Sequence, residues 1–162
     1  MQINTDETMT PQSRRGRILA IDYGQRRIGL AISDLLGYTA QPLPTIQVVS
    51  LQQTLVALEQ IIQDKQVVEI VVGLPLNMKG EKGVAAEAVL QFVQRLQTKF
   101  PGPIHTWDER WTTVAAQRAM LQFGQSPSRR KHQVDQIAAQ LILQSFLEYR
   151  RRANSDGQSP AA

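Results

Sequence analysis

The sequence predicts one α/β domain, with a mixed five-stranded sheet and helices on both faces. Two apolar runs near the N-terminus flank a short turn and predict an antiparallel hairpin. Residues 67–72 are nearly all apolar and rich in β-branched side chains, which is typical of a central strand covered on both faces. Helical and strand patterns alternate from there to the end of the domain. A meander followed by such alternation favours a mixed sheet.

The first element is the hairpin at residues 17–34. Its two apolar runs are joined by a polar turn at residues 24–27, a pattern typical of a β-hairpin. Because side chains alternate along a strand, Ile18, Ala20 and Asp22 share one face. A carboxylate at the end of an apolar face is costly to bury unless another group pairs with it. Asp22 is therefore the first candidate functional residue.

The later elements follow from the period of their apolar residues. Residues 45–49 predict a short third strand, which Pro42 and Pro44 confine to a strand start or a sheet edge. Ser50 and Gln53 match a capping box at the start of a helix. We expect helices at 51–65, 84–100 and 113–121, strands at 67–72 and 104–108, and a last helix that carries Asp135 and ends at residues 150–152. Residues 1–15 and 153–162 are polar and are expected to be disordered, which leaves residues 16–152 as the domain.

Composition limits the classes of function. The chain has 162 residues, enough for one domain with a proper core, and no apolar run approaches the length of a transmembrane helix. It contains no cysteine, which excludes disulfides and thiolate metal sites. We therefore expect a cytoplasmic protein without a membrane partner. Its net charge is +4, and its basic residues are mostly arginine, which suits phosphate oxygens and is compatible with nucleic-acid binding.

Three acidic residues occupy matched places in this order of elements. Asp22 closes the first strand, Glu109 follows the strand that starts at Ile104, and Asp135 lies at the start of the last helix. Hard cations such as Mg²⁺ prefer carboxylate oxygens, and a pair of them can activate water and stabilise the leaving oxygen of a phosphodiester. Each acid also has an ordinary interpretation: a turn residue, a solvated strand end or a partner of the helix dipole. Alternation places Asp108 and Glu109 on opposite faces, so only one of them should point into a shared site.

Several motifs resemble those of the YqgF family, RNase H-like proteins related to the RuvC Holliday-junction resolvases and often named pre-16S rRNA nucleases. The matching stretches are DYG at 22–24, IGLA at 28–31, SD at 33–34, GLPLNMKG at 73–80, DERWTT at 108–113 and VDQIAA at 134–139. The resemblance covers residues 17–149 and implies an RNase H-like fold. It also implies that Asp22, Glu109 and Asp135 are the catalytic residues and the ligands of Mg²⁺ or Mn²⁺, with Glu109 favoured over Asp108. Trp111 stands where the family more often has leucine.

The function that this resemblance implies is a metal-dependent endonuclease acting on structured nucleic acid. The leading substrate is the precursor of 16S rRNA, branched DNA of the Holliday-junction type is second, and the ribosome or its precursors are expected partners. The chain is expected to act as a monomer or a homodimer. Two alternatives stay open. One is a nucleotide-binding module of the kinase–actin class, which needs two lobes where this chain has length for one. The other is a non-catalytic nucleic-acid-binding adapter, against which the three retained acids argue.

Basic and aromatic side chains supply candidate contacts to nucleic acid. The candidates for phosphate binding lie in a turn or near one of the three acids in sequence: Arg26, Arg27, Arg110, Arg129, Arg130 and Lys131. The last three precede or open a helix, where cations oppose the dipole, and an anionic ligand or a solvated loop explains them equally well. Residues 150–152 are expected at a helix C-terminus, where the dipole accounts for their charge. Trp107 and Trp111 are able to stack on a base, although core packing is the stronger interpretation for Trp107.

Overall fold

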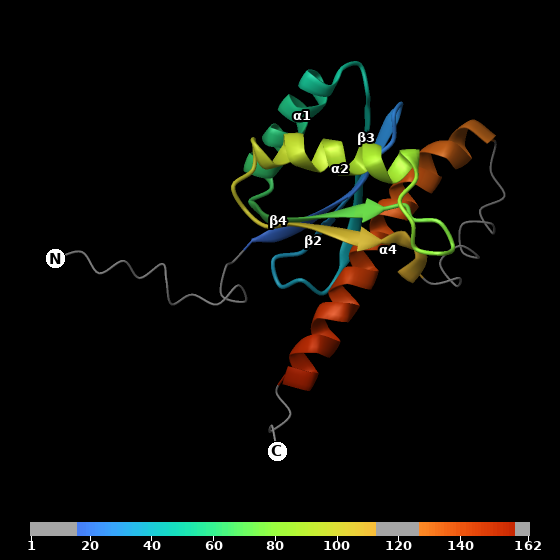
Figure 1. Ribbon diagram of the computed structural model, residues 1–162. Coiled ribbons are helices and arrows are strands. Elements are labelled where there is room, and N and C mark those ends of the chain that lie inside the picture. Colours follow the sequence, from blue (N-terminus) through green and yellow to red (C-terminus); the bar gives the residue numbers. More distant parts are fainter. Residues whose placement is uncertain (1–15, 113–126, 158–162) are drawn as a thin grey trace.

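The computed structural model describes residues 16–112 and 127–157, with side chains for residues 16–112 and 136–155. It contains a five-stranded sheet with the strand order β3-β2-β1-β4-β5, and helices cover both faces (Figure 1). This confirms the predicted fold class. The helix expected at residues 113–121 and the extension expected at residues 1–15 lie outside the described residues.

The elements follow the predicted order. They are β1 (Arg17–Asp22), β2 (Arg27–Ser33), β3 (Ala40–Gln47), α1 (Leu51–Asp64), β4 (Val67–Leu74), α2 (Val84–Gln97), β5 (Ile104–Asp108), the 3₁₀ turn η3 (Glu109–Trp111) and α4 (Pro127–Gly157). The first three strands pair in antiparallel fashion, whereas β4 lies parallel to β1 and β5 lies parallel to β4. The mixed sheet therefore has its parallel half where the strand–helix alternation was predicted.

Two cores lie on opposite faces of the sheet. On one face, α1 and α2 pack against the strands through side chains such as Leu58 and Phe92, both almost fully buried. On the other face, α4 packs against the sheet (Figure 1). Ile18 and Ala20 belong to the core beneath α4, as their alternation with Leu19 and Ile21 requires. None of the described helices is both long enough and apolar enough to cross a membrane.

The third strand begins earlier than predicted, at Ala40 rather than at residue 45. It is an edge strand, as the prolines indicated, and Pro42 lies opposite Ala31 in the pairing with β2. An edge strand has one side without a strand partner, so it tolerates the missing N–H of proline. The carbonyls of Ala40 and Leu43 accept hydrogen bonds from the side-chain amides of Gln140 and Gln136 on α4, at 2.9 and 3.1 Å.

Helix ends agree with the prediction at α1 and differ at the other two helices. The Ser50 hydroxyl accepts a hydrogen bond from the backbone N–H of Gln53, so the expected N-cap of α1 is confirmed. The end of α2 falls at Gln97 rather than at residue 100, and the Thr98 hydroxyl donates to the Arg95 carbonyl there. The helix α4 continues to Gly157, past the predicted end at residues 150–152, because neither glycine nor proline interrupts the polar sequence before that point.

A charged cluster lies at the start of β4, on the α4 face of the sheet. Glu69 is 9% exposed and accepts two hydrogen bonds from the guanidinium of Arg150, while His105 Nε2 lies 2.7 Å from Glu69 Oε1. Burial alone raises the pKa of Glu69, but the hydrogen bonds from Arg150 and His105 outweigh it, and the net pKa is lowered. The interpretation of Arg150 as a partner of the helix dipole is therefore wrong: it lies within α4 and neutralises a buried carboxylate.

Candidate active site

The carboxyl ends of three adjacent strands meet at one edge of the sheet. Asp22 is the last residue of β1, Gly73 lies near the end of β4, and Glu109 directly follows β5. Because β1, β4 and β5 are parallel, these ends point the same way, which is where α/β sheets place ligand sites. Asp22 continues the alternation of Ile18 and Ala20, so it belongs to the face that α4 covers.

The side chain of Glu109 lies across the backbone of β4, the strand between β1, which carries Asp22, and β5. A β-carbon placed on Gly73 would lie 2.7 Å from Glu109 Oε1 and 2.6 Å from Ile142 Cδ1 of α4. Both contacts are shorter than any normal contact of a β-carbon, so only glycine leaves room for this arrangement. The absence of a side chain on the middle strand therefore lets the carboxylate of Glu109 extend over β4 in the direction of β1.

The charges of these acids act on one another. Burial raises the pKa of Glu109 first, and the negative charges of Asp22 and Asp108 raise it further, to about 7. Like charges in a partly buried site favour the neutral acid, because one proton removes both the desolvation cost and the repulsion. Asp22 and Glu109 thus form an electrostatically coupled pair that a cation would relieve.

Asp108 has its own counter-ion in Arg110. Its carboxylate accepts hydrogen bonds from the backbone N–H of Arg110 and from the guanidinium, the closest at 2.6 Å from Nη2. These hydrogen bonds hold the pKa of Asp108 below its ordinary value against the effect of burial. The two neighbouring acids therefore have separate roles: Asp108 fixes Arg110, and Glu109 faces the region of Asp22.

Arg110 also connects the end of β5 to the loop that follows β4. Its Nη1 donates to the carbonyl of Met78 at 3.4 Å, and its guanidinium lies against Gly80, whose φ is +79°. Asn77 organises this loop: its side-chain oxygen accepts from the backbone N–H groups of Lys79 and Glu81. Residues 77–81 thus form a hydrogen-bonded turn beside the site.

The structure describes only the backbone of four other predicted site residues. Asp135, Arg129, Arg130 and Lys131 lie within α4, but their side chains are outside the described part of the structure. Arg26 and Arg27 lie at the turn between β1 and β2, where Arg26 is exposed. Among the described side chains, no group of three or more acids, histidines or cysteines is placed to hold a metal ion. Asp22 and Glu109 are the two of the three expected ligands whose side chains the structure describes.

Gly73 is the site residue that sequence reasoning did not single out. The strand was predicted at residues 67–72, whereas β4 extends to Leu74 and so includes Gly73. A glycine within a strand often marks a close approach of another group, and that signal was available in the sequence.

Replacing Gly73 by alanine should displace Glu109 and lower any activity that depends on it. The added methyl group meets the Glu109 carboxylate and the end of Ile142, so we also expect a loss of about 1–3 kcal/mol in stability from overpacking. Cleavage rates and urea unfolding of the variant measure the two effects. Gly83→Ala is the matched control, because a β-carbon there has no atom within 4 Å. Equal behaviour of the two variants would contradict the role assigned to Gly73.

The metal-free protein should lose stability as the pH rises from about 4.5 to about 7. The pKa of Glu109 is raised from 4.5 to about 7 in the folded state, so the folded chain binds more protons than the unfolded chain in this interval. We expect a loss of about 1–2 kcal/mol, which allows for the partial exposure of the side chain. Urea unfolding in EDTA at pH 5 and pH 8 measures it. Glu109→Gln should abolish this part of the pH dependence, and an unchanged slope would contradict the assignment.

Structural comparison finds the same fold in the protein RuvC. Thermus thermophilus RuvC, solved in complex with a Holliday junction substrate, superimposes with a TM-score of 0.57 over 83% of this chain and 96% of its own, at 12% sequence identity. At this identity the likeness shows the fold alone.

The chain belongs to the RuvX family, described as Holliday junction resolvases, which it matches over residues 16–149. This confirms the predicted resemblance. A protein of Koribacter versatilis named "Putative pre-16S rRNA nuclease" is 45% identical over 140 residues, which cover 86% of this chain and 92% of the relative. A Moorella thermoacetica protein of the same name is 47% identical over 132 residues, covering 82% and 94%. The chain is accordingly a hydrolase of the nuclease class.

Proposed function

We propose that this chain is a divalent-metal-dependent endonuclease that processes the precursor of 16S rRNA. The observation that carries the proposal is the coupled pair of Asp22 and Glu109, brought together over Gly73 at the carboxyl ends of parallel strands. The nuclease class of this chain is that of its family, and we take the substrate from the names of its relatives. Branched DNA is the second candidate substrate, because the family is described as Holliday junction resolvases.

The residues present fit a hard divalent cation. Asp22 and Glu109 offer carboxylate oxygens, which Mg²⁺ and Mn²⁺ prefer, and the repulsion that raises the pKa of Glu109 is what a bound cation would remove. Asp135 is proposed as the third ligand, from the motif in which it lies. When bound, the metal would activate water and stabilise the leaving oxygen of the phosphodiester.

The protein's own part in the reaction is to place and hold groups. Asp22 and Glu109 fix the position of the cation, and Gly73 leaves the space in which Glu109 extends. Arg110, held by Asp108 and the Met78 carbonyl, is a candidate to contact a phosphate oxygen near the cleaved bond. Such positioning and neutralisation of charge account for most of the catalysis in phosphoryl transfer.

The experiment is a side-by-side cleavage assay on precursor 16S rRNA and on a four-way DNA junction. Each substrate is incubated with Mg²⁺, Mn²⁺ or EDTA at the same ionic strength. The proposal expects cleavage of the RNA with either metal and none in EDTA. Preferred cleavage of the junction would replace the RNA by branched DNA as the substrate. Binding of both substrates without cleavage of either would support the non-catalytic adapter instead.

A further inference from the structure

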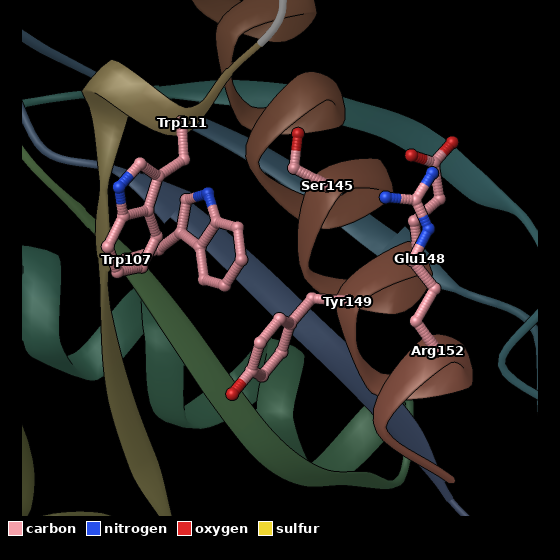
Figure 2. A pocket seen from close by; sticks show the side chains of 6 residues that line it. All are labelled: Trp107, Trp111, Ser145, Glu148, Tyr149 and Arg152. Carbon is pink, nitrogen blue, oxygen red and sulfur yellow. The ribbon is translucent and has the colours of Figure 1, made fainter. Parts of the chain in front are cut away.

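A pocket of about 390 Å³ lies between β5 and α4. Trp107 and Trp111 line it from the strand and the 3₁₀ turn, and Ser145, Glu148, Tyr149 and Arg152 line it from α4 (Figure 2). Its volume is near the lower end of the range for small-molecule sites, which suits a single planar ring system rather than an extended ligand.

The aromatic rings of this pocket are held at defined angles. Trp107 is buried and anchors the group, with edge-to-face contacts to Trp111 at 5.0 Å, to Tyr149 at 5.6 Å and to Phe146 at 5.9 Å. Trp111 and Tyr149 are 59% and 61% exposed, respectively. Large aromatic side chains that are fixed by a buried neighbour and yet exposed provide preformed faces for stacking.

The pocket is adjacent to the residues that we assign to cleavage. Glu109 lies between Trp107 and Trp111 in sequence, two residues from each. On α4, Ile142 contacts the Gly73 region beside Glu109, and Tyr149 is seven residues further along the same helix. Seven residues of an α-helix are about 10 Å long. Three stacked nucleotides of a nucleic-acid strand, or fewer unstacked ones, span about the same distance.

The polar groups around the rings favour a nucleobase over a purely apolar ligand. Ser145 can donate and accept, Glu148 accepts and Arg152 donates, so the rim offers partners to both kinds of group on a base edge. A lipid chain or an apolar peptide side chain would leave these groups unused. Arg152 also supplies positive charge for a phosphate next to the stacked base.

We propose that this pocket binds an unpaired nucleobase, stacked on Trp111 and Tyr149, a short distance along the strand from the phosphate that is cleaved. The proposal rests on the nuclease function. It adds a preference for substrates in which a base near the cleavage site is unpaired or is easily unstacked.

The two tryptophans of the pocket are the only ones in the chain, so intrinsic fluorescence reports on it directly. The full-length protein in EDTA is titrated with a single-stranded RNA hexanucleotide and with the same RNA carrying one abasic position at each site in turn. We expect quenching by the intact RNA and weaker quenching when one particular base is missing. Quenching that is the same for every abasic RNA would overturn the proposal, because phosphate contacts alone would then explain binding.

Variants separate stacking from apolar contact. Trp111→Leu keeps an apolar side chain and removes the ring, and should weaken binding of the intact RNA about 10-fold, within the range for loss of one stacked base. The affinity of this variant for the RNA whose missing base is the one that stacks in the pocket should equal that of the wild type. Tyr149→Ala should behave in the same way, whereas Tyr38→Ala, at an equally exposed tyrosine outside the pocket, should bind as wild type. Equal binding of intact RNA by wild type and both pocket variants would overturn the proposal.

Two further outcomes keep the pocket distinct from the nuclease assignment. Asp22→Asn should lose cleavage but keep the base-dependent quenching, since Asp22 does not line the pocket. A wild-type protein that cleaves RNA without base-dependent quenching would refute the proposed base binding in the pocket and leave the nuclease function standing.

The same experiments test whether the pocket is a contact between two copies of the chain. If the fluorescence changes with protein concentration, and Trp111→Leu abolishes a dimer in sedimentation, the surface joins two copies of the chain and the proposal fails.

Discussion

Replacing Asp22 by asparagine is expected to lower metal-dependent cleavage by roughly 100-fold or more, because loss even of groups that only support a metal ligand costs about 10–100-fold. The amide keeps the size of the side chain but removes the negative charge that we propose holds the cation. It also removes a charge that raises the pKa of Glu109. The folded protein should therefore be unharmed, and in EDTA at neutral pH its unfolding free energy should be equal to or above that of the wild type.

Single-turnover cleavage in Mn²⁺ measures the first part of this result, and urea unfolding in EDTA, followed by far-UV circular dichroism, measures the second. Asp64→Asn is the matched control: the same chemical change at an exposed acid of α1, on the other face of the sheet. It should cleave at the wild-type rate. Wild-type cleavage by Asp22→Asn would remove Asp22 from the site, and loss of both cleavage and circular dichroism signal would mean that its role is structural.

A second large effect, on stability, is expected from Arg150→Met. This change leaves Glu69 buried without its main counter-ion, and removing one partner of a buried ion pair costs about 3–5 kcal/mol. The side chain of Arg150 is 34% exposed, so we expect a smaller loss, about 2 kcal/mol at pH 7. Because the folded-state pKa of Glu69 is lowered, the wild-type advantage should be present above its unfolded pKa and be lost as the pH falls through the folded pKa.

Urea unfolding of four proteins tests this ion pair. Arg151→Met, at the exposed neighbouring position, is the control and should be close to wild type. The double variant Glu69→Met with Arg150→Met should recover much of the loss, since neither charge is then buried alone. A loss at Arg150 that the second substitution does not relieve would show that packing of the arginine on Phe146, 4.6 Å away, is the larger contribution.

The sequence predicted those parts of the fold that depend on local pattern. Alternation in the first strand assigned Ile18 and Ala20 to one face, and both lie in the core beneath α4. The cap at Ser50 and the strand at residues 104–108 were likewise set by short-range signals. Alternation predicted that only one of Asp108 and Glu109 points into the site, but it did not identify Arg110 as the partner of Asp108.

What the sequence did not predict depends on residues far apart in the chain. Glu69 and Arg150 are 81 positions apart, and only the packing of α4 on β4 brings them together. The passage of Glu109 over Gly73 likewise depends on β4 lying between β1 and β5. The early start of β3 reflects its place at the sheet edge, where pairing with β2 outweighs the low strand propensity of proline.

The hydrogen bonds from α4 to β3 have a consequence for self-association. An open edge strand is a template on which another chain can add a strand, and this is a common route to aggregation. At β3, two prolines lack the N–H that such a strand would need, and the carbonyls of Ala40 and Leu43 already have partners in Gln140 and Gln136. A second copy would have to displace both glutamines before it extended the sheet at this edge. The glutamines thus protect the chain from strand-to-strand polymerisation without adding charge to this edge of the sheet.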